Sequence, residues 1–271
     1  FSQEGVQEVS NGSFSQEGSE LVTNGDFATD SDWALGAGST ISGGILNHTG
    51  SSSDTFQTIS ITEKQYKLEY TIVSGSGSVR FWSNVGSYTT GQTGVGTYVS
   101  YFYYDSSIGN NGRFSIVLDG DISIDNVSVK EVGQDWNLGT GWSIGEGKAV
   151  FDGAGFNATR TNAGLITGKS YKVTFDLDII SGNVIVQLGG AANTFNTSTT
   201  HTFFDIATEN GSYSSFVSLY SSQTSNFSIT NISVKEVGQN WNLGTGWSIG
   251  EDKAISDGSG FGALSSSYSN F

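Results

Sequence analysis

Ser128–Ala149 reads SVKEVGQDWNLGTGWSIGEGKA, and Ser233–Ala254 reads SVKEVGQNWNLGTGWSIGEDKA. The two stretches lie 105 residues apart and differ at only two pairs of positions, Asp135/Asn240 and Gly147/Asp252. A repeat of that length is one small domain, so the sequence predicts a tandem array of one module. Arrays of small modules build length or present repeated binding surfaces, which favours a structural or binding protein over an enzyme.

The hydrophobic pattern is that of β-strands. YKVTFDLDI (171–179) alternates apolar and polar residues, and YKLEYTIV (66–73) repeats the pattern, as expected for half-buried antiparallel strands. About eight such strands in a module of this length predict a jelly-roll β-sandwich. We therefore expect an all-β chain of tandem antiparallel sandwiches: a first module at 20–134, a second at 135–239 and an incomplete third at 240–271.

In the last strand of each module, the apolar residues shift from even-numbered to odd-numbered positions, or the reverse, partway along the strand. In ISIDNVSV (122–129) the apolar residues Ile122 and Ile124 share one parity, and Val127 and Val129 share the other. FSITNISV (227–234) repeats this change. One extra residue in the strand would return both pairs to the core, which predicts a β-bulge at Asp125-Asn126 and at Thr230-Asn231.

A shorter repeat opens the chain. FSQEGVQEVSNGS (1–13) is followed by FSQEGSELVTNGD (14–26), with Glu, Val and Asn-Gly recurring every 13 residues. Asn-Gly is a strong turn signal, so this repeat predicts short strands separated by turns. We interpret residues 1–19 as an extended N-terminal stalk, with a flexible repetitive linker as the alternative.

The third copy stops at Phe271, too soon to close a sandwich. Alone it would expose four apolar side chains, those of Trp241, Trp247, Ile255 and Phe261. Either the natural chain continues and completes the module, or another subunit supplies the missing strands, with the segment 1–26 as the donor. The tryptophans Trp136 and Trp142 of the second module should be at least partly buried.

Composition excludes several classes of partner. The chain has 26 acidic and 11 basic residues, a net charge of −15, which argues against binding to a nucleic-acid backbone or an anionic membrane. No apolar run approaches the length of a membrane span. Cysteine is absent, so disulfides and thiolate metal sites are excluded.

Several segments resemble a known style of module: ELVTNGDFATDSDW (20–33), GTGWSIGEGKAVFDG (139–153), GKSYKVTFDL (168–177) and IDNVSVKEV (124–132). The chain resembles the carbohydrate-binding-module-like jelly rolls, related to the galactose-binding-like sandwiches and common in fibres and appendages of marine bacteriophages. The resemblance implies a non-catalytic sandwich, sometimes glycan-binding. It also implies a structural calcium ion at Asp26 and Asp125 of the first module, whereas Thr230 replaces Asp125 in the second.

Catalysis finds little support in the sequence. No P-loop, G-x-S-x-G or H-E-x-x-H motif occurs. The two histidines, His48 and His201, occupy unrelated places in the two modules, and we expect both to be exposed polar residues. We predict that the protein is not an enzyme and needs no cofactor apart from the calcium named above.

Aromatic residues suggest a binding surface in the first module. YVSYFYYD (98–105) places rings on both faces of a strand, so Tyr101 and Tyr103 should lie near solvent while the neighbouring rings feed the core. Phe81 should point inward and Trp82 outward. We predict that Trp82, Tyr101 and Tyr103 form a platform that stacks on sugars. The alternative is that these rings pack against a loop or a neighbouring subunit.

Together these features predict a non-enzymatic structural protein of a virion surface, such as a fibre or appendage, that attaches to cell-surface glycans. Its partners would be other virion subunits, including copies of itself. The alternatives are a secreted glycan-binding adhesin, an accessory module of a carbohydrate-active enzyme, and the subunit of an extracellular filament.

Overall fold

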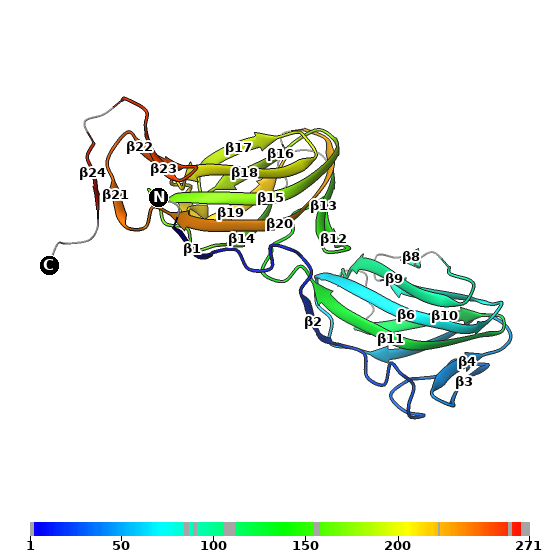
Figure 1. The fold of residues 1–271 in the computed structure, drawn as a ribbon. Helices are drawn as coiled ribbons and strands as arrows, with labels where there is room; N and C mark the ends of the chain where they lie inside the picture. The colour runs from blue at the N-terminus through cyan, green and yellow to red at the C-terminus, as the bar shows by residue number, and fades with distance from the viewer. Residues whose placement is uncertain are drawn as a thin grey trace. The chain divides into compact units, whose positions relative to one another are not determined.

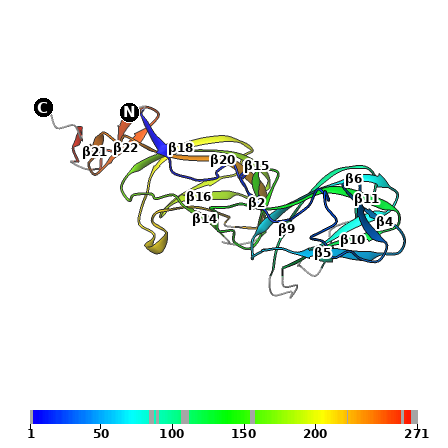
Figure 2. The ribbon, with the colours of Figure 1, turned by 90° about the horizontal axis from the view of Figure 1, so that it is seen from below.

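The computed structural model describes residues 3–83, 87–88, 91–105, 112–153, 158–221, 223–259 and 262–266. The chain forms two compact units (Figures 1 and 2). Sandwich 1 is Glu17–Val132, and sandwich 2 is Phe1–Gln16 together with Gly133–Val237, to which the third copy of the module is attached. No helix among the described residues is long and apolar enough to cross a membrane.

Sandwich 1 consists of two antiparallel sheets, which confirms the predicted all-β sandwich. One sheet has the order β3-β4-β11-β6-β9, with β2 also paired to β11, and the other has the order β5-β10-β7-β8. The strands are β2 (Glu17–Glu20), β3 (Ser39–Ser42), β4 (Ile45–His48), β5 (Ser53–Thr58), β6 (Gln65–Gly75), β7 (Ser78–Ser83), β8 (Ser87–Tyr88), β9 (Gly96–Tyr103), β10 (Arg113–Asp119) and β11 (Ile122–Val132).

Sandwich 2 repeats this topology. Its sheets have the orders β12-β13-β20-β15-β18, with β1 paired to β20, and β14-β19-β16-β17. A short 3-10 helix, η2 (Gly211–Tyr213), precedes β19. The strands are β1 (Glu4–Gln7), β12 (Trp142–Gly145), β13 (Lys148–Gly153), β14 (Thr159–Asn162), β15 (Ser170–Ser181), β16 (Val184–Leu188), β17 (Ala191–Phe195), β18 (Thr199–Ile206), β19 (Phe216–Tyr220) and β20 (Ser225–Val237).

The alternating strands point one face into each core, as predicted. In β15 the side chains of Tyr171, Val173, Phe175 and Leu177 are buried, while the residues between them are half-buried on the outer face. β6 shows the same alternation. Burial of an apolar side chain contributes roughly 1.5–3 kcal/mol, so this alternation fixes the register of the central strands.

Both predicted β-bulges are present. In β11, Asp125 pairs with Thr71 and Ser128 pairs with Glu69, so that Asn126 and Val127 together lie opposite one residue of β6. β20 has the same irregularity at Asn231 and its neighbour Ile232. Asn126 and Asn231 have φ angles of 55° and 54°, a left-handed conformation that asparagine tolerates better than most residues. The bulge keeps the apolar residues on both sides of it in the core.

The 13-residue repeat does not form the extended stalk that the sequence suggested. β1 of the first repeat pairs with β20 of sandwich 2, and β2 of the second repeat pairs with β11 of sandwich 1 (Figure 1). The apolar residues of the repeats are buried: Val9 and Phe14 in sandwich 2, and Val22 and Phe27 in sandwich 1. These side chains need an apolar partner, which a free strand-turn repeat lacks.

The Asn-Gly turns of the repeat are confirmed. The amide of Phe14 donates a hydrogen bond to the carbonyl oxygen of Asn11, and that of Phe27 donates to Asn24. The unit boundaries follow from this docking. Sandwich 1 begins at Glu17 rather than Glu20, and residues 1–16 belong to sandwich 2 although the whole of sandwich 1 separates them from it in the sequence.

The third copy forms two short strand pairs. The strand β21 (Trp241–Leu243) pairs with β24 (Leu264–Ser266), and β22 (Trp247–Gly250) pairs with β23 (Lys253–Ser256). The hairpin β22-β23 is the pair that packs against sandwich 2. β22 and β23 lie beside β18, where Ile249 and Ile255 line a hollow with Phe204 and Ile206. Trp241 and Trp247 are half-buried and Ile255 is exposed, whereas Phe261 lies outside the described residues.

Candidate functional site

The candidate site of sandwich 1 is built by the second repeat. β2 follows the edge of β11 beyond the point where β4 ends, because β4 pairs with Ile122–Ile124 and β2 pairs with Lys130 and Val132. The amide of Leu21 donates to the carbonyl of Val129 at 3.0 Å, which continues the ladder. The repeat therefore forms one wall over the outer face of the sheet that contains β6 and β11.

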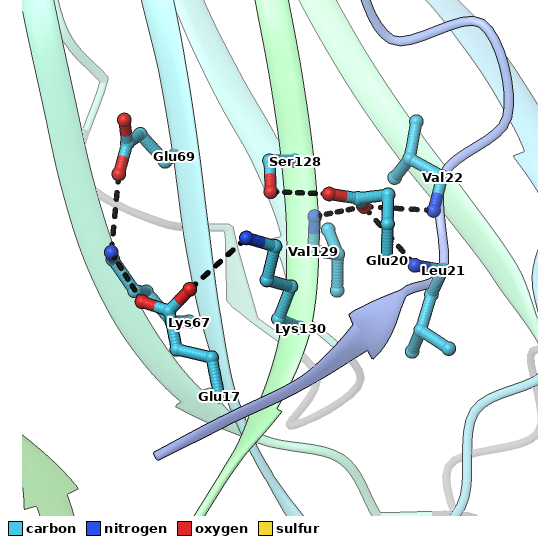
Figure 3. A network of polar contacts seen from close by, with 9 residues as sticks. All are labelled: Glu17, Glu20, Leu21, Val22, Lys67, Glu69, Ser128, Val129 and Lys130. Carbon is cyan, nitrogen blue, oxygen red and sulfur yellow. Dashed lines mark hydrogen bonds and ion pairs between the residues drawn. The ribbon is translucent and has the colours of Figure 1, made fainter. Parts of the chain in front are cut away.

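An ion-pair network joins this wall to the sheet (Figure 3). The carboxylate of Glu17 accepts hydrogen bonds from Lys67 Nζ at 2.7 Å and from Lys130 Nζ at 3.1 Å. Lys67 Nζ also lies 3.2 Å from the carboxylate of Glu69. The Lys67 and Lys130 ammonium groups hold the pKa of Glu17 below its ordinary value of 4.5, and Glu17 raises the pKa of Lys67. These shifts keep the Glu17 carboxylate and the Lys67 ammonium group charged at neutral pH, so the ion pair between them is maintained.

Glu20 has a structural role in the same wall. Its carboxylate accepts hydrogen bonds from the amides of Leu21, Val22 and Val129 and from the hydroxyl of Ser128 (Figure 3). A carboxylate that accepts several backbone N–H groups holds a segment firmly, because charge-assisted hydrogen bonds are about twice as strong as neutral ones. Glu20 thus holds the backbone of Leu21 and Val22, directly after β2, against β11.

A polar hollow of about 540 Å³ opens between the repeat and the sheet. Its charged lining residues are Glu17, Glu20, Asp26, Lys67, Glu69 and Lys130. Its neutral polar lining includes Thr71, Thr97, Asn126 and Ser128. Four carboxylates against two ammonium groups leave an acidic excess. The hydroxyl groups of Thr71 and Thr97 lie 3.0 Å apart at one side of the hollow.

Two of the predicted platform residues continue this face. Tyr101 pairs with Lys67 across β6 and β9, and Tyr103 pairs with Gln65. Directly opposed residues of an antiparallel pair share a face of the sheet, with Cβ atoms about 5 Å apart, so Tyr101 lies on the outer face next to Lys67, which lines the hollow. Tyr103 is 42% exposed, and burial raises the pKa of its phenol, which stays protonated.

Trp82, the third predicted platform residue, does not join them. It lies on β7, in the other sheet, where it pairs with Ser115 of β10 and Tyr88 of β8. Phe81 is buried and Trp82 is half-buried, as their predicted directions require. β7 and β9 follow each other closely in the sequence, but the jelly roll places them in opposite sheets, so the three rings do not form one platform.

The residues of the implied calcium site are only partly suited to it. Asp26 lines the hollow, and one of its oxygens accepts a hydrogen bond from the amide of Ala28 at 3.3 Å. Both oxygens of Asp125 accept hydrogen bonds from Asn126. The described residues contain no group of three or more His, Cys, Asp and Glu side chains that could hold a metal ion. Calcium takes six to eight oxygen ligands, so most would have to be amide, carbonyl or water oxygens.

The expectation that both histidines are exposed was wrong, and His48 is fully buried. Its Nδ1 lies 3.0 Å from the hydroxyl of Ser39 and its Nε2 lies 3.2 Å from the carbonyl oxygen of Ser51. His201 is half-buried, with its ring stacked on Phe175. Both residues pack within a sheet.

Sandwich 2 has part of the same site. Glu4 bridges Lys172 and Lys235 as Glu17 bridges Lys67 and Lys130. At the positions of Tyr101 and Tyr103, however, it has Phe204 and Ile206, next to the hairpin of the third copy. Asp176 replaces Thr71, and hydrogen bonds from Asn231 and Thr200 engage its carboxylate. The polar hollow with two tyrosines on the same face of the sheet is therefore a property of sandwich 1.

Sequence reasoning missed the ion-pair residues of the site, although a signal was present. The glutamates recur with the 13-residue period and the lysines with the 105-residue period, at Glu4/Glu17, Lys67/Lys172 and Lys130/Lys235. The acidic residues of the short repeat and the lysines of the long repeat have opposite charges, which is consistent with docking of the short repeat on the modules.

Comparison with known proteins adds little. No family model and no characterised protein sequence matches this chain. Among solved structures it is similar to an F-lectin (fucolectin) from striped bass serum, with 7% identity and a TM-score of 0.25 over 80% of this chain and 98% of the lectin. It is also similar to a truncated AlyQ with CBM32 and alginate lyase domains, with 13% identity and a TM-score of 0.19 over 72% of this chain and 74% of the other. Scores this low carry no argument.

Proposed function

We propose that this chain is a non-enzymatic extracellular structural protein, a fibre or appendage of a virion surface, whose sandwich 1 binds neutral glycans in the hollow between β2, β6 and β11. The observation that carries the glycan proposal is the register of Tyr101 opposite Lys67, which places a half-buried ring next to a residue that lines the polar hollow of about 540 Å³.

The chemistry of the hollow suits a sugar. A pyranose presents hydroxyl groups around its ring and an apolar face, and tyrosine rings stack on such a face while their hydroxyl groups remain solvated. Thr71, Thr97 and Asn126 provide neutral donors and acceptors, and Asp26 provides a charged acceptor. The ion pairs around Glu17 hold the wall in place before any ligand binds, which lowers the entropic cost of binding.

The charge of the site selects among sugars. The lining has four carboxylates and two ammonium groups, and Glu17 and Glu69 engage Lys67. The remaining field repels uronic and sialic acids, and the protein as a whole carries a net charge of −15. Neutral or amino sugars are therefore the proposed ligands.

The structural part of the proposal is supported by the tandem arrangement. Two sandwiches of the same topology share one pattern of docked N-terminal strands, which suits a chain whose role is to extend and present modules. A secreted adhesin or an accessory module of a carbohydrate-active enzyme is the second candidate, because the same hollow would serve it. Immunolabelling of native particles in electron micrographs separates these settings.

A glycan array tests the binding proposal with the full chain. We expect binding to neutral glycans and its weakening, by up to about tenfold, in Tyr101→Ala, since an aromatic ring contact contributes about 0.5–1.5 kcal/mol beyond the area that it buries. Tyr213→Ala is the control, because Tyr213 is a surface tyrosine (43% exposed) that lies in sandwich 2. Equal binding by the Tyr101→Ala variant, or no binding to any glycan of a broad array, contradicts the proposal.

A further inference from the structure

The segment Glu4–Phe14, here called the arm, occupies a defined acceptor on sandwich 2. The amide of Glu8 donates to the carbonyl of Val234 at 2.9 Å, and the amide of Ile232 in the bulge donates to the carbonyl of Gly12 at 2.9 Å. Val9 and Phe14 are 3% and 1% exposed. The arm therefore fills an edge of β20 and supplies part of the core.

Trp136 closes the acceptor around the arm. Its ring centroid lies 5.0 Å from that of Phe14, and its Nε1 donates to the carbonyl of Asn11 at 3.2 Å. Asn11 in turn donates from Nδ2 to the carbonyl of Gln134 at 3.0 Å. Apolar, backbone and side-chain contacts together recognise one short sequence pattern.

Sandwich 1 holds the second repeat in the same way. Val127 takes the place of Ile232, with its amide donating to Gly25 at 2.8 Å. Trp33 takes the place of Trp136, with Nε1 3.1 Å from the carbonyl of Asn24 and its ring 5.4 Å from Phe27. The two sandwiches thus bind the two repeats through equivalent contacts, so the docking is specific to the sequence of the repeat.

The arm is not continuous with the sandwich it completes. It runs through Ser15 and Gln16 directly into β2 of sandwich 1, and the remainder of sandwich 2 begins only at Gly133. Every contact between the arm and β20 would be the same if the arm came from a second copy. Exchange of an identical element between protomers loses no contact, so its cost in free energy is low.

We propose that the acceptor of sandwich 2 also takes the arm of a second copy of this chain, so that copies are joined by strand exchange along β20. The partner is defined by the chemistry of the arm: a strand that begins with a glutamate for Lys172 and Lys235, followed by a valine, an Asn-Gly turn and a phenylalanine. This surface is separate from the proposed glycan hollow and does not rest on it.

Single cysteines in the full chain test the exchange, because the chain has no cysteine of its own. Gln7 of the arm pairs with Lys235 of β20, at a spacing that a disulfide bridges. Chains carrying only Gln7→Cys are mixed with chains carrying only Lys235→Cys and oxidised. We expect a disulfide-linked dimer of twice the 28.6 kDa mass. Lys64→Cys, at an exposed lysine of sandwich 1, is the control for random collision of thiols.

A second substitution, Gly12→Val, should change the yield of mixed dimer in opposite directions, depending on which of the two cysteine chains carries it. A Cβ at residue 12 would overlap the carbonyl oxygen of Ile232, so Gly12→Val expels the arm that carries it. In the Lys235→Cys chain it empties the acceptor and should raise the yield of mixed dimer. In the Gln7→Cys chain it spoils the donor and should abolish the dimer.

The proposal is overturned if the double variant Gln7→Cys/Lys235→Cys closes its disulfide within one chain while the mixed single variants give no more dimer than the Lys64→Cys control. It is equally overturned if Gly12→Val changes the yield alike in both partners, because the dimer would then not depend on docking of the arm.

Discussion

The backbone amide of Val127 donates a hydrogen bond of 2.8 Å to the carbonyl oxygen of Gly25. Val127 lies in the bulge of β11, where its amide has left the ladder with β6, and Gly25 belongs to the Asn-Gly turn of the second repeat. A Cβ on Gly25 would overlap the carbonyl oxygen of Val127, so only glycine allows this approach. The parity change in the last strand marks the bulge that supplies the amide of Val127, and the Asn-Gly turn in the repeat supplies the carbonyl group that accepts its hydrogen bond.

The conformation of the bulge predicts a graded response at Asn126. Its φ of 55° is left-handed, which costs most L-residues about 1–2 kcal/mol and is most strained for a β-branched side chain. We expect Asn126→Val to lower the free energy of unfolding of sandwich 1 by at least that amount and Asn126→Gly to leave it nearly unchanged. Chemical denaturation measures both, and equal stability of the two variants contradicts the prediction.

Trp136 should be a main anchor of sandwich 2. It is 7% exposed and Trp142 is 5% exposed, which confirms the predicted burial of both. We expect Trp136→Ala to cost about 3–5 kcal/mol and to release the arm, because Phe14 and Asn11 both lose their partner. Thermal unfolding and hydrogen exchange at the amides of Glu8 and Ile232 measure the two effects. Tyr213→Ala is the control, and an unchanged unfolding temperature in Trp136→Ala would refute the prediction.

Docking of both repeats should weaken in acid. Hydrogen bonds from Lys172 and Lys235 lower the pKa of Glu4 below its ordinary 4.5, as Lys67 and Lys130 do for Glu17. A carboxyl whose pKa is lower in the folded state contributes stability that is full above pH 4.5 and is lost as the pH falls through the lowered pKa. We expect the stability difference between about pH 7 and pH 3 to shrink in Glu4→Gln and in Glu17→Gln. Variants with the pH dependence of the parent would show that these pairs are without effect, as many exposed pairs are.

Calcium binding at Asp26 stays a prediction that the full chain can test. If the ion binds the folded state of sandwich 1, millimolar calcium should raise its unfolding temperature, because a ligand of the native state stabilises it by mass action. Asp26→Asn should remove the shift. Asp178→Asn, at a strand position of sandwich 2, is the control. A chain whose unfolding temperature does not respond to calcium contradicts the prediction.

Local patterns in the sequence determined much of the fold. Alternation over 66–73 and 171–179 identified the central strands because each residue's face in a strand follows from its neighbours alone. The parity change identified the bulges for the same reason. The duplicated Trp-containing segments identified the modules, since repetition needs no knowledge of the structure.

Only the tertiary structure decided where separate segments meet. Tyr101 and Trp82 are 19 positions apart, yet they lie in different sheets, whereas Glu17 and Lys130 are 113 positions apart and form an ion pair. The 13-residue period likewise revealed two equal segments but not the acceptor of each. Docking depends on the edge of β20, the amide of Ile232 and the ring of Trp136, and these come together only when long-range strand pairing closes the sheet.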